Sequence, residues 1–168
     1  FRQKIISFKI KNKIIYGLNK IEKEISSKKF QFNEKYEDIH LNIEKRLFQI
    51  IGDEAGYLHI ARSRNDQVIT DFKIWIRSAS KKIIIRIDSI IKNSLKLAEK
   101  NVDTIMPGFT HLKNAQAISF AHYIMAYIEM FERDKKRFFN NLESLNENPL
   151  GVCAISGTSF KIDRWYTT

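Results

Sequence analysis

The segment HIARSRNDQV at residues 59–68 gathers side chains of the kinds that bind anions. Arg62, Ser63, Arg64 and Asn65 supply guanidinium, hydroxyl and amide donors in consecutive positions, directly before a stretch with helical periodicity. The N-terminus of a helix also offers unpaired backbone N–H groups and the positive end of the helix dipole. The segment therefore predicts a site for a carboxylate or a phosphate, with Asn65 or Asp66 as the helix cap.

A purely structural role explains the same residues. In that case Asp66 caps the helix, the arginines form ion pairs with nearby acids such as Asp53 and Glu54, and no ligand binds. The residue types by themselves leave both interpretations open.

A second group of reactive residues lies in MPGFTHLKNAQ, residues 106–116, where Thr110 and His111 are expected in a loop that leads into a helix. Histidine exchanges a proton near neutral pH, and a neighbouring hydroxyl can hold a substrate oxygen. The pair predicts acid–base chemistry on a substrate that carries a carboxylate. A surface histidine without a catalytic role is the alternative.

Two long helices are expected to position these groups. No glycine or proline occurs from Tyr57 to Met106, and apolar residues recur there at helical spacing, which predicts a helix from about Asp66 to Lys100. A second helix is expected from about Ala115 to Leu145. The sequence has no alternating strand pattern, and two long helices with a short connection run antiparallel. The expected fold class is therefore all-α, a bundle of long helices.

The expected antiparallel pair places the two polar groups at opposite ends of the first long helix. At 1.5 Å per residue this separation is roughly 50 Å. If both groups serve one site, different subunits must supply them. The apolar flanks of the two helices also call for partner helices, which predicts a bundle between copies of the chain.

Composition excludes several classes of function. The net charge is +10, but the lysines are scattered and form no compact basic stripe, so no nucleic-acid partner is expected. His122 and Glu129 interrupt the most apolar stretch, so no membrane span is expected. A single cysteine, Cys153, allows no internal disulfide, which favours a cytoplasmic location. Asp38 and His40 resemble metal ligands, but no second histidine pair has ligand spacing, so no metal is expected.

Four segments resemble argininosuccinate lyases of the fumarase and aspartase superfamily in order and approximate spacing. They are EDIHLNIEKRL, HIARSRNDQVITD, MPGFTHLKNAQAISFAHYIMAYIEMFERD and NPLGVCAISGTSFKIDR, and the resemblance runs from about Gly17 to Arg164. ARSRNDQV is the most specific, because other members of the superfamily place different residues before the shared Asn-Asp. Adenylosuccinate lyase, fumarase and aspartase are thereby disfavoured.

The resemblance implies a mostly helical homotetramer whose active sites are shared between subunits. It implies that residues 1–61 belong to an N-terminal helical domain and residues 62–168 to the first part of a central helical bundle. The implied reaction is the reversible β-elimination of argininosuccinate to arginine and fumarate, without a metal or an organic cofactor.

The resemblance also implies the roles of five residues. Ser63 and Asn65 bind substrate, with Arg64 as an additional anion contact. Thr110 of another subunit holds a carboxylate, and His111 takes part in proton transfer or polarises the group that does.

The sequence also departs from the family pattern. Lys113 replaces a usual glutamine, Ala117 replaces a common proline, and WYTT follows IDR. The serine loop with the family's GSSxMPxKxN signature is absent, so the chain is expected to be an N-terminal to central fragment. The alternatives are a non-catalytic helical assembly module, a decayed lyase fragment, or a basic nucleic-acid binder.

Overall fold

The computed structural model describes residues 1–168, mostly as helices with one two-stranded sheet. Its residues group into two compact units. Unit 1 combines Phe1–Thr70 with Asn148–Thr168, and unit 2 comprises Asp71–Glu147. The predicted boundary at residues 61/62 concerns the domains of the complete protein and stays a prediction.

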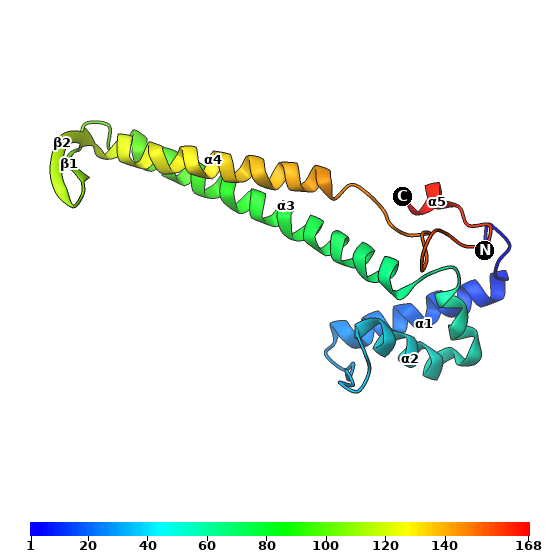
Figure 1. Cartoon of the computed structure of the whole chain (residues 1–168). Helices are drawn as coiled ribbons and strands as arrows, with labels where there is room; N and C mark the ends of the chain where they lie inside the picture. The colour runs from blue at the N-terminus through cyan, green and yellow to red at the C-terminus, as the bar shows by residue number, and fades with distance from the viewer. The chain divides into compact units, whose positions relative to one another are not determined.

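Unit 1 is built around two packed helices, α1 (Phe8–Ser26) and α2 (Ile39–Ile51), which lie side by side in Figure 1. Side chains cap both helices: Ser7 accepts from the Ile10 N–H and Asp38 from the Leu41 N–H, at 3.2 and 2.6 Å. A 3-10 helix, η1 (Gly52–His59), follows α2.

Close packing of α1 on α2 depends on a glycine. A Cβ atom on Gly17 would lie 2.3 Å from Cδ1 of Leu47, whose side chain is fully buried. Ile14 and Ile21 complete this core. The glycine, which costs helix stability elsewhere, therefore lets the two helices approach each other.

Unit 2 is an antiparallel pair formed by α3 (Arg64–Glu99), most of which lies in this unit, and α4 (Phe120–Ser144). Ile87 and Ile91 of α3 pack with Ile128 of α4. Asp88 of α3 forms an ion pair with Lys135 of α4 at 2.5 Å. Lys73, nearer the start of α3, bonds to Glu147 just after α4, whereas Asp88, further along α3, pairs with Lys135 within α4. The two helices therefore run in opposite directions, which confirms the predicted antiparallel arrangement.

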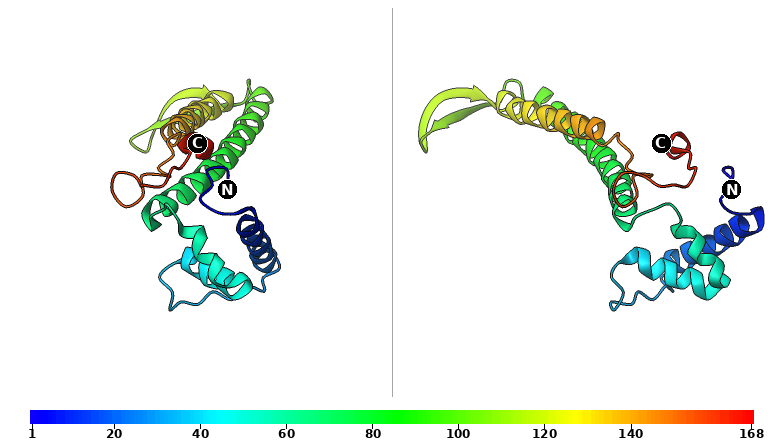
Figure 2. Two further views of the ribbon diagram at one scale, coloured as in Figure 1. Left: turned by 90° about the vertical axis from the view of Figure 1, so that its right-hand side faces the viewer. Right: turned by 45° about the vertical axis from the view of Figure 1, so that its right-hand side comes forward.

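A β-hairpin connects the two helices and adds one small sheet to the predicted helical fold. Strand β1 (Ile105–Thr110) pairs antiparallel with β2 (Lys113–Ser119), and Figure 2 shows the hairpin projecting from the end of the helix pair. The second helix therefore starts at Phe120, not at about Ala115. Ser119 caps it by accepting from the His122 N–H at 3.1 Å.

Pairing between the two segments overrides the helical pattern of residues 115–119. Met106 lies opposite Ile118, and Pro107 opposite Ala117. The backbone N–H and C=O groups of residues 115–119 therefore pair with a neighbouring strand instead of forming helical hydrogen bonds. A Cβ atom on Gly108 would lie 2.8 Å from the Gln116 carbonyl oxygen, so the strands approach closely only because residue 108 is glycine.

The last part of the chain is largely irregular and ends in the short helix α5 (Arg164–Thr167). None of the helices carries an apolar stretch of the length that a membrane crossing requires. The structure thus confirms a mostly helical protein and adds a small sheet between its two longest helices.

Candidate active site

Residues 59–68, the HIARSRNDQV segment called the donor segment below, form a cap at the start of α3. Ser63 precedes the helix, and its hydroxyl accepts from the Asn65 N–H at 3.3 Å. The Asp66 carboxylate in turn accepts from the Ser63 N–H at 3.0 Å through Oδ1. The exchange resembles a capping box, but the serine hydroxyl accepts from the second helical residue instead of the third, and Asp66 replaces the usual Glu or Gln. It fixes the backbone of the donor segment and leaves Asn65 exposed.

Asp66 also fastens the C-terminal segment to this cap. Its second oxygen, Oδ2, accepts from the Cys153 N–H at 2.9 Å, and the Cys153 thiol donates to the Ala61 carbonyl at 3.1 Å. Only 3% of Asp66 is exposed. Asp66 thus contributes to the cap from the first turn of α3, whereas Ser63 is the residue that precedes the helix. Cys153 contacts the donor segment directly.

Ala61 and Cys153 both adopt a left-handed backbone conformation, with φ of 56° and 55°. This conformation is uncommon for residues other than glycine and is retained where surrounding contacts enforce it. The bond between the Cys153 thiol and the Ala61 carbonyl joins the two residues.

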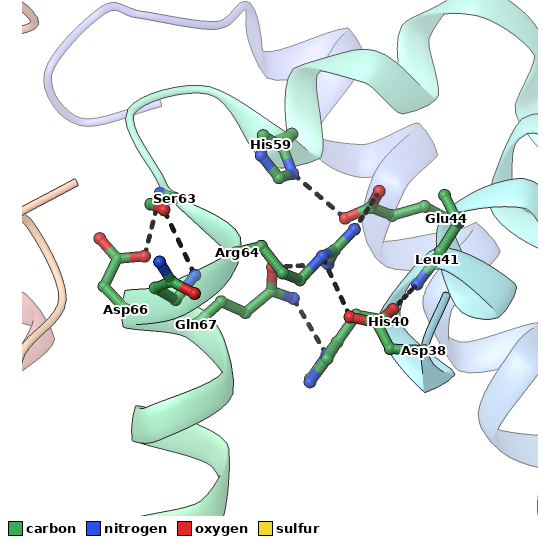
Figure 3. A network of polar contacts seen from close by, with 10 residues as sticks. Asp38, His40, Leu41, Glu44, His59, Ser63, Arg64, Asp66 and Gln67 are labelled. Atoms are coloured by element: carbon green, nitrogen blue, oxygen red, sulfur yellow. Dashed lines mark hydrogen bonds and ion pairs between the residues drawn. The ribbon is translucent and has the colours of Figure 1, made fainter. Parts of the chain in front are cut away.

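Arg64 is the centre of a polar network that Figure 3 shows. Its Nη2 donates to Glu44 at 2.9 Å, its Nη1 donates to Gln67 at 3.0 Å, and its Nε lies 3.3 Å from Asp38. The other oxygen of Glu44 contacts Nδ1 of His59 at 3.2 Å. His59 and Arg64 thus share the Glu44 carboxylate.

The network determines the ionisation of its members. Burial by itself would raise the pKa of Glu44, but hydrogen bonds from Arg64 and His59 outweigh it, so this pKa lies below its usual value. Burial opposes the charge of Arg64, yet the hydrogen bond to Glu44 raises its pKa. Both groups are therefore held in their charged forms.

The ion pairs differ from those expected under the structural alternative. Arg64 pairs with Asp38 and Glu44 of the α2 region and not with Asp53 or Glu54. Glu54 instead binds Lys13 of α1. The acidic partners lie 20 residues or more before Arg64 in the chain, so no local spacing in the sequence identifies them.

Arg62 is placed differently from Arg64. Its Nη2 is buried and has no hydrogen-bond partner. Burial lowers the pKa of Arg62, although the charges of Glu44 and Asp66 oppose this effect. The sequence marks Arg62 only as one donor among several, because neither its burial nor its lack of a partner is visible there.

Thr110 and His111 lie at the tip of the hairpin in unit 2. Thr110 ends β1 opposite Lys113, so His111 and Leu112 form a two-residue turn. Both turn residues have positive φ, 52° and 62°, the conformation that two-residue hairpin turns require. Both predicted site residues are exposed, and Leu112 is 98% exposed.

The structure thus gathers the five predicted site residues into two groups. Ser63, Arg64 and Asn65 share one turn in unit 1, whereas Thr110 and His111 share the hairpin tip in unit 2. A pocket of about 890 Å³ beside residues 29–36 and α2 includes none of them. In its lining, Arg46 binds Glu24 through two nitrogens at 2.7 and 2.9 Å.

Residues 3–168 match the protein family described as Lyase. The chain is 75% identical to the argininosuccinate lyase of Pelagibacter ubique (strain HTCC1062) over 168 residues, which are 100% of this chain and 36% of that protein. The chain therefore spans about a third of the length of this curated relative.

Two solved structures share the fold. A crystal structure of EDDS lyase in complex with formate superposes with a TM-score of 0.86 and 27% identity, covering 99% of this chain and 32% of that one. An EDDS lyase variant with bound fumarate superposes with a TM-score of 0.84 and the same identity and coverage.

Proposed function

The chain belongs to the lyase family that it matches over residues 3–168, and from this premise we propose that it is part of an argininosuccinate lyase. The observation that carries the proposal is 75% identity, over the whole chain, to a relative of that name. The segment ARSRNDQV supports it, since this segment carries the most specific part of the resemblance to argininosuccinate lyases.

The proposed reaction is a β-elimination. A base removes a proton from the carbon next to a carboxylate, the carbon–nitrogen bond breaks, and an acid protonates the departing guanidine, so that fumarate and arginine are formed. Negative charge develops on the carboxylate during proton removal, and positioned donors stabilise it. The formate and fumarate bound to EDDS lyase are both carboxylates.

Five residues carry the proposed chemistry. Ser63 and Asn65 bind substrate through hydroxyl and amide groups, and Thr110 holds a carboxylate. His111 transfers a proton or polarises the group that does. Arg64 remains a proposed anion contact, but each of its three nitrogens already faces a protein group, so its larger contribution is to hold the turn that presents Ser63 and Asn65.

We propose that the complete protein is a cytoplasmic homotetramer with active sites shared between copies, and that it needs no cofactor. The donor segment lies at the start of α3 and the hairpin follows the end of this helix, and α3 has 36 residues, which corresponds to about 54 Å. Large apolar side chains are exposed along α3, including Phe72 and Trp75, whose rings stack at 6.2 Å. These side chains offer contact area to other copies.

A graft tests the proposed function. The chain replaces the corresponding 168 residues of the Pelagibacter ubique argininosuccinate lyase, and fumarate release from argininosuccinate is followed by ultraviolet absorbance. We expect an active enzyme, and we expect His111→Asn in the graft to lower kcat by about two orders of magnitude or more, as for the loss of an acid–base group.

His122→Asn is the matched control for the graft, because His122 is an exposed histidine on α4 outside the proposed site. An assembled, folded graft without turnover would contradict the proposed activity. Full activity of the His111→Asn graft would contradict the role of this histidine alone.

A further inference from the structure

The guanidinium of Arg62 carries the one buried side-chain nitrogen or oxygen in the structure without a hydrogen-bond partner. Buried donors are almost always paired, because an unpaired one loses its bonds to water and gains nothing in return. The cost is larger for a charged group. Burial also lowers the pKa of Arg62, which shows that its surroundings disfavour the cation.

The nearby acids do not supply the missing acceptor. Glu44 directs one oxygen to Arg64 and the other to His59. Asp66 directs its two oxygens to the backbone N–H groups of Ser63 and Cys153. Both carboxylates favour a positive charge at Arg62 through space, yet neither forms a hydrogen bond with Nη2.

The two arginines of the donor segment therefore differ in whether they retain an unpaired hydrogen-bond donor. The guanidinium of Arg64 is bound to protein groups, whereas Arg62 retains a desolvated donor in the same turn as Ser63 and Asn65. A guanidinium pairs best with a planar anion that accepts two parallel hydrogen bonds, which is the geometry of a carboxylate. A neutral ligand would leave the burial of the charge uncompensated.

We infer that Arg62 is an additional substrate-binding residue, whose Nη2 donates a hydrogen bond to a carboxylate of a small dicarboxylate of the fumarate class. The choice of a dicarboxylate rests on the proposed function. Arg64 then serves as a positioning residue that holds the turn.

Fumarate binding to the 168-residue chain tests this inference. Thermal unfolding and isothermal titration are measured with fumarate, and with fumaramide as a probe of the same skeleton without charge. We expect fumarate to raise the Tm and fumaramide to leave it unchanged. Arg62→Met should weaken fumarate binding about tenfold or more, as for the loss of a charged hydrogen bond. Arg62→Lys, which retains the charge, should bind fumarate with an affinity between those of the wild type and of Arg62→Met.

The ligand-free Tm separates a binding role from a structural one. Because Nη2 of Arg62 is buried without a partner, Arg62→Met should leave the Tm of the free chain unchanged or raise it. Arg77→Met is the charge-matched control, since Arg77 is exposed on α3, and it should retain the fumarate response.

Two results would overturn the inference. One is a lower Tm of ligand-free Arg62→Met together with unchanged fumarate binding, which would make Arg62 a structural residue. The other is a wild-type chain whose Tm does not respond to fumarate. Another segment of the complete polypeptide would then supply the acceptor.

Failure of the proposed function gives a different pattern. The graft with its native Arg62 would be folded and inactive, while the isolated chain would still bind fumarate in a manner that depends on Arg62. The inference that Arg62 binds a carboxylate would then hold, and the proposed lyase activity would be wrong.

Discussion

Replacing Asp66 with asparagine should destabilise unit 1, because a single buried carboxylate holds two backbone N–H groups there. One belongs to Ser63 at 3.0 Å and the other to Cys153 at 2.9 Å, and 3% of Asp66 is exposed. A hydrogen bond to a charged group contributes about 1.5–3 kcal/mol. The amide side chain of the variant would keep one acceptor oxygen but direct an NH₂ group at the other donor.

The expected loss in the free energy of unfolding for Asp66→Asn is therefore about 2–4 kcal/mol. This value exceeds the about 0.3–1 kcal/mol that a negative charge in the first turn gains from the helix dipole. The two hydrogen bonds of Asp66, to Ser63 and to Cys153, should thus contribute more than its interaction with the helix dipole.

Urea unfolding of the 168-residue chain, followed by circular dichroism, measures this loss. Asp103→Asn is the control, since Asp103 is an exposed aspartate in unit 2, and should change the free energy little. Hydrogen exchange supplies a local readout, because the Cys153 amide should exchange faster in Asp66→Asn than in the wild type.

A loss of less than about 0.5 kcal/mol, the range of ordinary surface substitutions, would refute this reasoning. Unchanged exchange at the Cys153 amide would refute it as well, because the carboxylate would then not hold the C-terminal segment.

Two further substitutions test the packing and charge of unit 1. Because the folded pKa of Glu44 is lowered, its contribution to stability is present above its ordinary value of 4.5 and is lost as the pH falls. Glu44→Gln should flatten the acid side of the profile of denaturation midpoint against pH, and an unchanged profile would contradict the network. Gly17→Ala should cost about 1–2 kcal/mol in urea unfolding, since overpacking against buried Leu47 exceeds the gain in helix propensity. Asn19→Ala, at an exposed position of α1, is its control, and equal stability of both variants would contradict the close contact.

The sequence predicted the two long helices well, because their apolar repeats extend over many turns. The first was expected from about Asp66 to Lys100 and is observed at Arg64–Glu99. The hairpin was not predicted, because its strands are short and exposed and lack alternating polarity, and only the pairing of residues 105–110 with 113–119 reveals them.

By itself the sequence determined which residue types gather in the donor segment and that a long helix starts there, because capping and periodicity are local properties. Only the tertiary structure decided which arginine is engaged and which is free. Glu44 and Asp38 reach Arg64 from the α2 region, and Cys153 reaches Asp66 across 87 positions of the chain. The burial and pairing of a side chain depend on these distant contacts, so only the folded chain distinguishes the unpaired donor of Arg62 from the paired guanidinium of Arg64.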